Sequence, residues 1–169
     1  MKRLRIVTEG GTEETFVNEI LRPHLFEKQI FDVAGLRIQT SPGHKGGFVN
    51  YQHLKNDVTR ILKESNVVVS TFVDFFRIPT SMPDYELMTQ AVKADQKIEI
   101  LENGLTEDIN HPNFIPHIQK FEFEALLFSN NQGFSRMYNE PSIARATQAI
   151  IDQYNNPEEI NNHPNTAPS

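Results

Sequence analysis

The chain has 169 residues, with 16 Lys and Arg against 22 Asp and Glu and a net charge of -6. It contains no cysteine, which excludes disulfides, zinc-thiolate sites and cysteine nucleophiles, so any metal must be bound by oxygen or imidazole. The acidic balance argues against a DNA-binding module that works by bulk electrostatics. It does not argue against a nuclease, because carboxylates that bind divalent cations add negative charge.

The chain has no apolar stretch of the ~20 residues that a membrane span needs, and its N-terminus lacks the apolar core of a signal peptide. We therefore expect a cytoplasmic protein with no membrane partner. Homo-oligomerisation is left open by the sequence.

The first predicted strand covers residues 4–8 and runs into the turn Glu9-Gly10-Gly11. The two glycines allow a sharp turn. In an open α/β sheet, ligands bind outside the carboxyl ends of the strands, so Glu9 is a candidate site residue.

A helix is predicted from Thr12, as its N-cap, to about Lys28, with Pro23 bending or ending its regular part. Glu13 and Glu14 lie in its first turn, where the helix dipole favours acidic side chains. That stabilising role accounts for Glu14, and we count Glu13 as supporting the site beside the two glycines.

The chain then alternates a short strand at 35–40, a Gly-rich loop at 41–47 and an amphipathic helix at 50–65. The loop carries His44 and Lys45, which we expect to contact the phosphate backbone of a nucleic acid. The alternative for such a loop is a mobile surface segment without that role.

Residues 67–73 form a nearly continuous apolar run, as in a parallel strand buried on both faces, and end at Asp74. A loop at 75–83 contains Arg77, counted as supporting the site, and a helix is predicted over 84–104. A further strand at 114–119 leads to Glu122 and Glu124.

This order of elements predicts an α/β fold with a mainly parallel sheet flanked by helices on both faces. We expect one domain over residues 1–160, followed by the polar segment 161–169.

Carboxylates at the ends of strands are suited to Mg²⁺ or Mn²⁺, which take one or two protein carboxylates together with water and phosphate oxygens. The predicted catalytic and metal-binding set is Glu9, Asp74 and Glu124, with Glu122 as a further metal ligand. If this segment is helical, Glu122 and Glu124 point ~200° apart around its axis, and Glu124 is the preferred ligand. The alternative for both is the acidic first turn of a helix.

Three motifs resemble an uncharacterised bacterial Toprim-like family: residues 8–13 (Thr-Glu-Gly-Gly-Thr-Glu), 71–79 (Thr-Phe-Val-Asp-Phe-Phe-Arg-Ile-Pro) and 121–128 (Phe-Glu-Phe-Glu-Ala-Leu-Leu-Phe). This family is related to the overcoming-lysogenization-defect nucleases. The resemblance implies a Toprim-like fold, Mg²⁺ at Glu9 and Asp74, a nucleic-acid substrate and an ATPase partner in defence against foreign DNA.

The chain departs from the Toprim pattern at Phe76, where many members have a second Asp, and Glu124 is the expected substitute. The family usually continues past a Thr-Ala-Pro-Ser segment, which is residues 166–169 here, so the resemblance implies a truncated chain. Two hypotheses follow: a Mg²⁺-dependent nuclease acting on DNA rather than RNA, which we favour, and a catalytically degenerate Toprim module that binds nucleic acid or a partner protein.

Overall fold

The computed structural model describes residues 2–41, 44–45, 48, 50–76 and 78–160, with only the backbone for residues 40, 41, 44 and 45. The chain divides into two compact units, unit 1 (Met1–Gln119) and unit 2 (Lys120–Ser169). The expectation of one domain over 1–160 did not include this boundary. The segment 161–169 lies outside the described residues.

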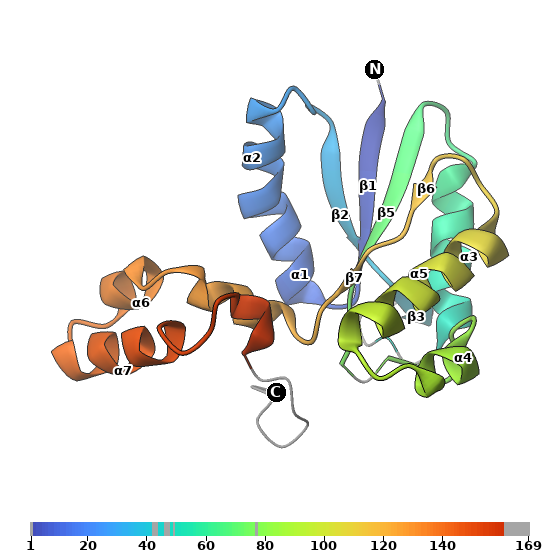
Figure 1. The fold of residues 1–169 in the computed structure, drawn as a ribbon. Helices are drawn as coiled ribbons and strands as arrows, with labels where there is room; N and C mark the ends of the chain where they lie inside the picture. Colours follow the sequence, from blue (N-terminus) through green and yellow to red (C-terminus); the bar gives the residue numbers. More distant parts are fainter. Residues whose placement is uncertain (1, 42–43, 46–47, 49, 77, 161–169) are drawn as a thin grey trace. The chain divides into compact units, whose positions relative to one another are not determined.

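Unit 1 is built on a sheet in which every strand pair is parallel. Its strand order is β2-β1-β5-β6, and β7 also pairs with β5 (Figure 1). The strands are β1 (Arg3–Thr8), β2 (Val33–Arg37), β5 (Val67–Asp74), β6 (Phe114–Ile115) and β7 (Ile118–Gln119). The predicted parallel α/β fold is therefore confirmed.

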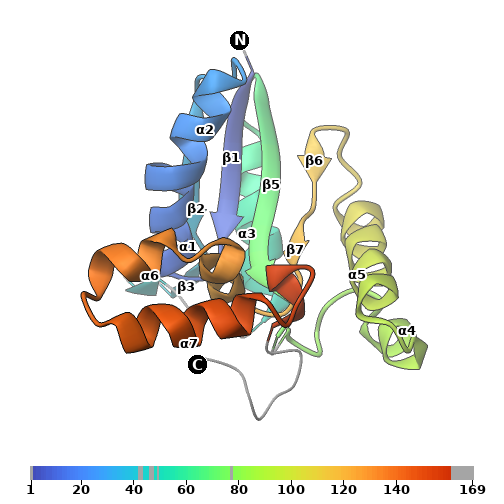
Figure 2. The same cartoon turned by 60° about the vertical axis from the view of Figure 1, so that its left-hand side comes forward.

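Helices flank the sheet on both faces, as expected (Figures 1 and 2). Alternate residues of β1 and β5, such as Val7, Val69 and Val73, pack in one core with helices α3 (Tyr51–Leu62) and α5 (Ala94–Ile109). The opposite face carries α1 (Gly11–Phe16), a π-helical segment η1 (Val17–Leu21) and α2 (Arg22–Glu27), which contact β1 and β2. We call this opposite face the α1 face.

The first helix begins two residues earlier than predicted, since its N-cap is Gly10 rather than Thr12 and its first residue is Gly11. The reason is the carboxylate of Glu13, which accepts a hydrogen bond from the Gly10 backbone N–H at 3.0 Å, as in a capping box. The helix continues to Glu27 through η1, which directly precedes α2 and its Pro23. Proline has no N–H for the regular helical ladder, and π-helical hydrogen bonds are one way to accommodate it.

Part of the predicted loop at 41–47 is a strand pair, because the backbones of β3 (Gln39–Ser41) and β4 (His44–Lys45) pair antiparallel. The predicted helix at 50–65 is confirmed as α3. The side chain of Asn50 caps it by accepting a hydrogen bond from the backbone N–H of Gln52 at 2.7 Å.

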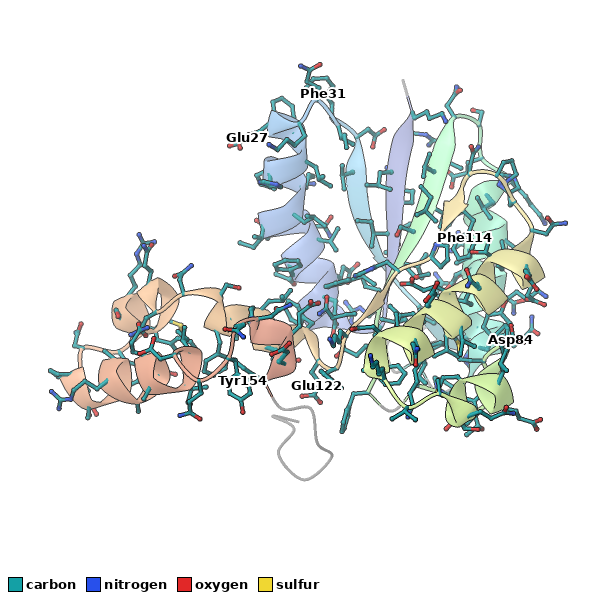
Figure 3. All side chains as sticks on the ribbon, viewed as in Figure 1. Glu27, Phe31, Asp84, Phe114, Glu122 and Tyr154 are labelled. Carbon is teal, nitrogen blue, oxygen red and sulfur yellow. The ribbon has the colours of Figure 1, made fainter. Side chains whose placement is uncertain are left out.

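The single helix predicted over 84–104 is wrong, since the chain forms α4 (Tyr85–Gln90) and α5 (Ala94–Ile109). Ala91 has an extended backbone and Val92 is 90% exposed, so the apolar pattern that suggested one helix is interrupted there. Asp84 precedes α4 (Figure 3). Its backbone is in the left-handed conformation, and its side chain does not cap the helix. The predicted strand at 114–119 is divided into β6 and β7.

Unit 2 contains η2 (Phe123–Ser129), a 3-10 helix, followed by α6 (Gln132–Met137), α7 (Pro141–Ile151) and η3 (Pro157–Glu159). Asn131 joins the start of α6 to α7, because its side chain donates to the Ala144 carbonyl at 2.8 Å and accepts from the Thr147 hydroxyl at 2.6 Å. In neither unit do the described residues include a helix long and apolar enough to cross a membrane.

A polar contact joins α3 to α5 in unit 1. The Tyr51 hydroxyl donates to the Asp108 carboxylate, and Lys55 Nζ lies 2.8 Å from the same group. Burial, and then the hydrogen bond to Asp108, raise the pKa of Tyr51 well above its usual value of 10. The pKa of Asp108 lies below its usual value; burial opposes this shift, and hydrogen bonds from Lys55 and Tyr51 outweigh burial.

This contact predicts a loss of stability at alkaline pH. Above pH 10 the unfolded chain releases the Tyr51 proton while the folded protein keeps it, so the free energy of unfolding falls by up to about 1.4 kcal/mol per pH unit. Tyr51→Phe should remove this contribution, measured by urea unfolding between pH 9 and about 11. Tyr154→Phe, at a partly exposed tyrosine, is the control, and equal slopes for both variants would contradict the prediction.

Candidate functional site

Glu9 lies at the carboxyl end of β1, directly before the cap of α1. Its backbone N–H donates to the Phe72 carbonyl of β5 at 3.4 Å, and its side chain is half-buried. A Cβ at Gly10 would lie 2.8 Å from a carboxylate oxygen of Glu13, so the glycine leaves room for that side chain to cap the turn. The turn therefore places Glu9 at the strand end while Glu13, which is 9% exposed, caps the helix.

Asp74 is the last residue of β5, the strand next to β1. Thr8 pairs with Phe72, so Glu9 aligns with the residue before Asp74. With the usual strand spacing and rise, the Cα atoms of Glu9 and Asp74 lie about 6 Å apart. The structure therefore brings these two residues to one edge of the sheet, as predicted from the apolar runs that precede them.

An ion pair lies at the same edge, at the end of β2. Arg37 donates from Nε and Nη2 to one carboxylate oxygen of Glu14, at 3.0 and 2.8 Å. Gly11 lies beside it, since a Cβ there would be 3.4 Å from Arg37 Nη1. Glu14 thus binds β2 to the first turn of α1, a structural role beyond the expected effect on the helix dipole.

Glu122 and Glu124 belong to unit 2, whereas Glu9 and Asp74 belong to unit 1. Glu122 directly precedes η2 (Figure 3) and is 5% exposed. Glu124 lies within η2 and is half-buried. The convergence of Glu124 with the two strand-end carboxylates stays a prediction.

The predicted cationic residues fall largely outside what the structure describes. Arg77 lies outside the described residues, and for His44 and Lys45 the described part is the backbone of β4. Several other basic residues of unit 1 are ion-paired: Arg3 with Glu64, Arg5 with Asp32, Lys55 with Asp108, and Arg60 with Asp57.

Among the described residues, no three His, Asp or Glu side chains are grouped so as to hold a metal ion. Glu9 and Asp74 are a pair, which matches the one or two protein carboxylates that Mg²⁺ commonly takes. Two hard oxygen donors at the open end of a parallel sheet thus fit Mg²⁺ or Mn²⁺ better than a softer metal.

An apolar pocket of about 410 Å³ lies at the opposite end of this sheet. Its lining includes Leu4, Ile115 and Phe31, of which Phe31 is labelled in Figure 3. These residues are at or near the amino ends of the strands, so the pocket is separate from the edge that carries Glu9 and Asp74.

The sequence analysis missed His117, which follows β6 and precedes β7. Its ring stacks on Phe72, with centroids 5.9 Å apart and planes 9° apart. A histidine between two short apolar segments gave no signal of this contact, because it depends on the pairing of β7 with β5.

Comparison with curated proteins gives no match, and comparison with solved structures gives none. The profile of one protein family, described as "Domain of unknown function (DUF4276)", matches residues 8–169. The matched region includes the turn at Glu9, the strand that ends at Asp74 and the glutamates of unit 2. The chain therefore belongs to the DUF4276 family.

Proposed function

We propose that this protein is a Mg²⁺- or Mn²⁺-dependent nuclease, or a related phosphodiester enzyme, of Toprim-like type. The observation that carries the proposal is the position of Glu9 and Asp74 at the carboxyl ends of two adjacent, hydrogen-bonded parallel strands. This is the edge at which α/β sheets bind ligands. The motif resemblance supports the same assignment.

In the proposed site, Glu9 and Asp74 at the ends of β1 and β5 would hold the ion. A divalent ion bound there would supply Lewis acidity at a phosphoryl oxygen and would lower the pKa of a bound water. The Arg37 and Glu14 pair keeps the first turn of α1 against β2 beside these carboxylates.

The β3–β4 hairpin is the proposed contact for the phosphate backbone, through His44 and Lys45. Lys45→Ala should weaken the binding of nucleic acid to a similar degree for all sequences. It should also reduce the slope of log K against log salt by about 1, because one phosphate contact is lost. Fluorescence anisotropy at several salt concentrations measures both quantities.

Lys97→Ala, on α5, is the control for removing a cation from unit 1. If Lys45→Ala binds nucleic acid with the affinity and salt slope of the wild type, β3 and β4 are not part of the binding site. Thermal unfolding of both variants should match the wild type, since both substitutions are made at polar positions.

The wider proposal is that the enzyme acts in the cytoplasm on DNA rather than RNA, with an ATPase partner, in defence against phage. The chain has no Gly-x-x-x-x-Gly-Lys-Ser/Thr phosphate loop, so a partner would have to provide ATP hydrolysis.

A catalytically degenerate module is the second candidate. Phe76 occupies the position of the second Asp in many Toprim proteins, and the described residues contain no group of three metal-binding side chains. Such a module would bind nucleic acid or a partner protein through the same edge without cleaving.

The test is a cleavage assay of the full chain on single- and double-stranded DNA and RNA, in Mg²⁺, Mn²⁺ or EDTA. Cleavage with either ion, and none in EDTA, supports the enzyme. Binding of nucleic acid without cleavage, together with no metal-dependent change in thermal stability, favours the degenerate module.

A further inference from the structure

Three aromatic rings lie nearly parallel on the α1 face of unit 1. Phe16 of α1 stacks on Phe72 of β5, with centroids 5.8 Å apart and planes 21° apart. Phe72 also stacks on His117 at 5.9 Å and 9°. Phe72 is 8% exposed, whereas the His117 side chain is 51% exposed. The group thus has a buried ring at Phe72 and an accessible ring at His117.

The backbone on either side of His117 is held at three points. The Thr71 hydroxyl donates to the His117 carbonyl at 2.7 Å and accepts from its backbone N–H at 2.9 Å. The next residue, Ile118, donates its N–H to a Glu102 carboxylate oxygen at 2.8 Å. These contacts fix the position from which the imidazole extends, so its ring is presented with little backbone freedom.

The stack lies beside the carboxylate edge. Val73 of β5 pairs with Ile118 of β7, and Asp74 pairs with Gln119. Phe72 and His117 each precede the first of these pairs by one residue, so they lie side by side. Asp74 is two residues beyond Phe72 and points to the same face of the sheet. Two residues of strand span about 6.6 Å, so the rings and Asp74 are close enough to contact one nucleotide.

We propose that His117, supported by Phe72, is a stacking platform for a base of a single-stranded nucleic acid bound at this edge. The inference rests on the proposed function and specifies its substrate as an unpaired strand. An exposed flat ring backed by a second ring is the arrangement on which successive bases stack, whereas the bases of a duplex are already stacked on one another. A strand with a base on His117 would lie with its backbone toward Asp74.

The experiment measures binding rather than cleavage. Fluorescence anisotropy of the full chain in EDTA is recorded with a single-stranded DNA, an RNA of the same sequence and the corresponding DNA duplex. His117→Ala should weaken binding of both single strands by about tenfold and change duplex binding little. His117→Phe, which keeps a flat ring without a charge, should bind single strands as well as the wild type.

His24→Ala is the matched control, because His24 is an exposed histidine on α2 of the same unit. It should leave all three affinities unchanged. Circular dichroism of each variant checks that the fold is kept.

A second measurement detects the stacking itself. The chain has no tryptophan, so His117→Trp introduces a single one at the platform. Its fluorescence should be quenched when a single strand binds, and quenched far less by the duplex.

The outcomes separate this inference from the proposed function. If the wild type binds single strands and His117→Ala binds them equally well, the platform is wrong while the enzyme proposal stands. If His117→Phe loses as much affinity as His117→Ala, the imidazole acts through its charge or hydrogen bonds, and stacking is wrong. If the wild type binds no nucleic acid in EDTA, the platform is wrong, and the cleavage assay in Mg²⁺ or Mn²⁺ decides the enzyme proposal separately.

Discussion

Asp74→Asn is expected to abolish metal-dependent cleavage while leaving the fold intact. The amide has nearly the same shape as the carboxylate, so the change removes charge without opening a cavity. Loss of the ligand at the end of β5 should weaken binding of the ion and lower the cleavage rate by roughly a thousandfold. This factor corresponds to the several kcal/mol by which a bound metal stabilises the transition state. Initial rates in Mn²⁺ with single- and double-stranded DNA measure this.

A second readout does not depend on an ATPase partner. A divalent ion that binds only the folded protein, at a concentration of about 100 times its dissociation constant, stabilises the fold by about 2.7 kcal/mol. The melting temperature of the wild type should therefore rise with Mn²⁺, and that of Asp74→Asn should not. Asp152→Asn makes the same chemical change at an exposed position after α7 and should behave as the wild type.

Equal cleavage by the wild type and Asp74→Asn would show that Asp74 is not a metal ligand for the reaction. An equal rise in melting temperature with Mn²⁺ would place the ion elsewhere. Glu9→Gln should match Asp74→Asn in both readouts, because the two residues lie at neighbouring strand ends.

Gly35→Ala should destabilise the protein by about 2 kcal/mol, the usual cost of overfilling a packed contact. A Cβ at Gly35 would lie 3.0 Å from the Cβ of Val17 and 3.1 Å from the backbone oxygen of Glu14. The Gly35 N–H also donates to the Asn18 side chain at 3.0 Å, which holds the helix close. The helix would have to move away from β2, and its first turn borders the candidate site.

Gly11→Ala is the matched control, since a Cβ there meets no atom closer than Arg37 Nη1 at 3.4 Å, the end of a flexible side chain. Urea unfolding measures the two variants under one set of conditions. If Gly11→Ala lowers the free energy of unfolding as much as Gly35→Ala does, the lost stability comes from replacing glycine itself. It would then not come from the close packing on β2.

The strand ends were predictable because each follows a run of apolar residues. The runs before Glu9 and Asp74 are long enough to identify β1 and β5, and a parallel sheet then requires their carboxyl ends to share one edge. The capping role of Glu13 could also have been inferred, because the glutamate stands three residues after Gly10.

Other features depend on contacts that the local pattern does not contain. The break at Ala91 to Lys93 has no glycine or proline to mark it. The contact between Phe72 and His117 follows from the strand order, which places β7 beside β5. The boundary after Gln119 follows from how contacts are distributed along the chain rather than from a change in composition.

The pairing of β1 with β5 also affects how the protein folds. Arg3 pairs with Val67, so β1 and α1, β2 and α3 are all synthesised before the strand that completes the sheet centre. Bringing strands so distant in sequence together costs loop entropy before the stabilising contacts between them form. Folding is therefore slower than for a helical bundle. A nascent chain that ends before Val67 contains Glu9 but lacks Asp74, so the carboxylate pair arises only when the sheet is assembled.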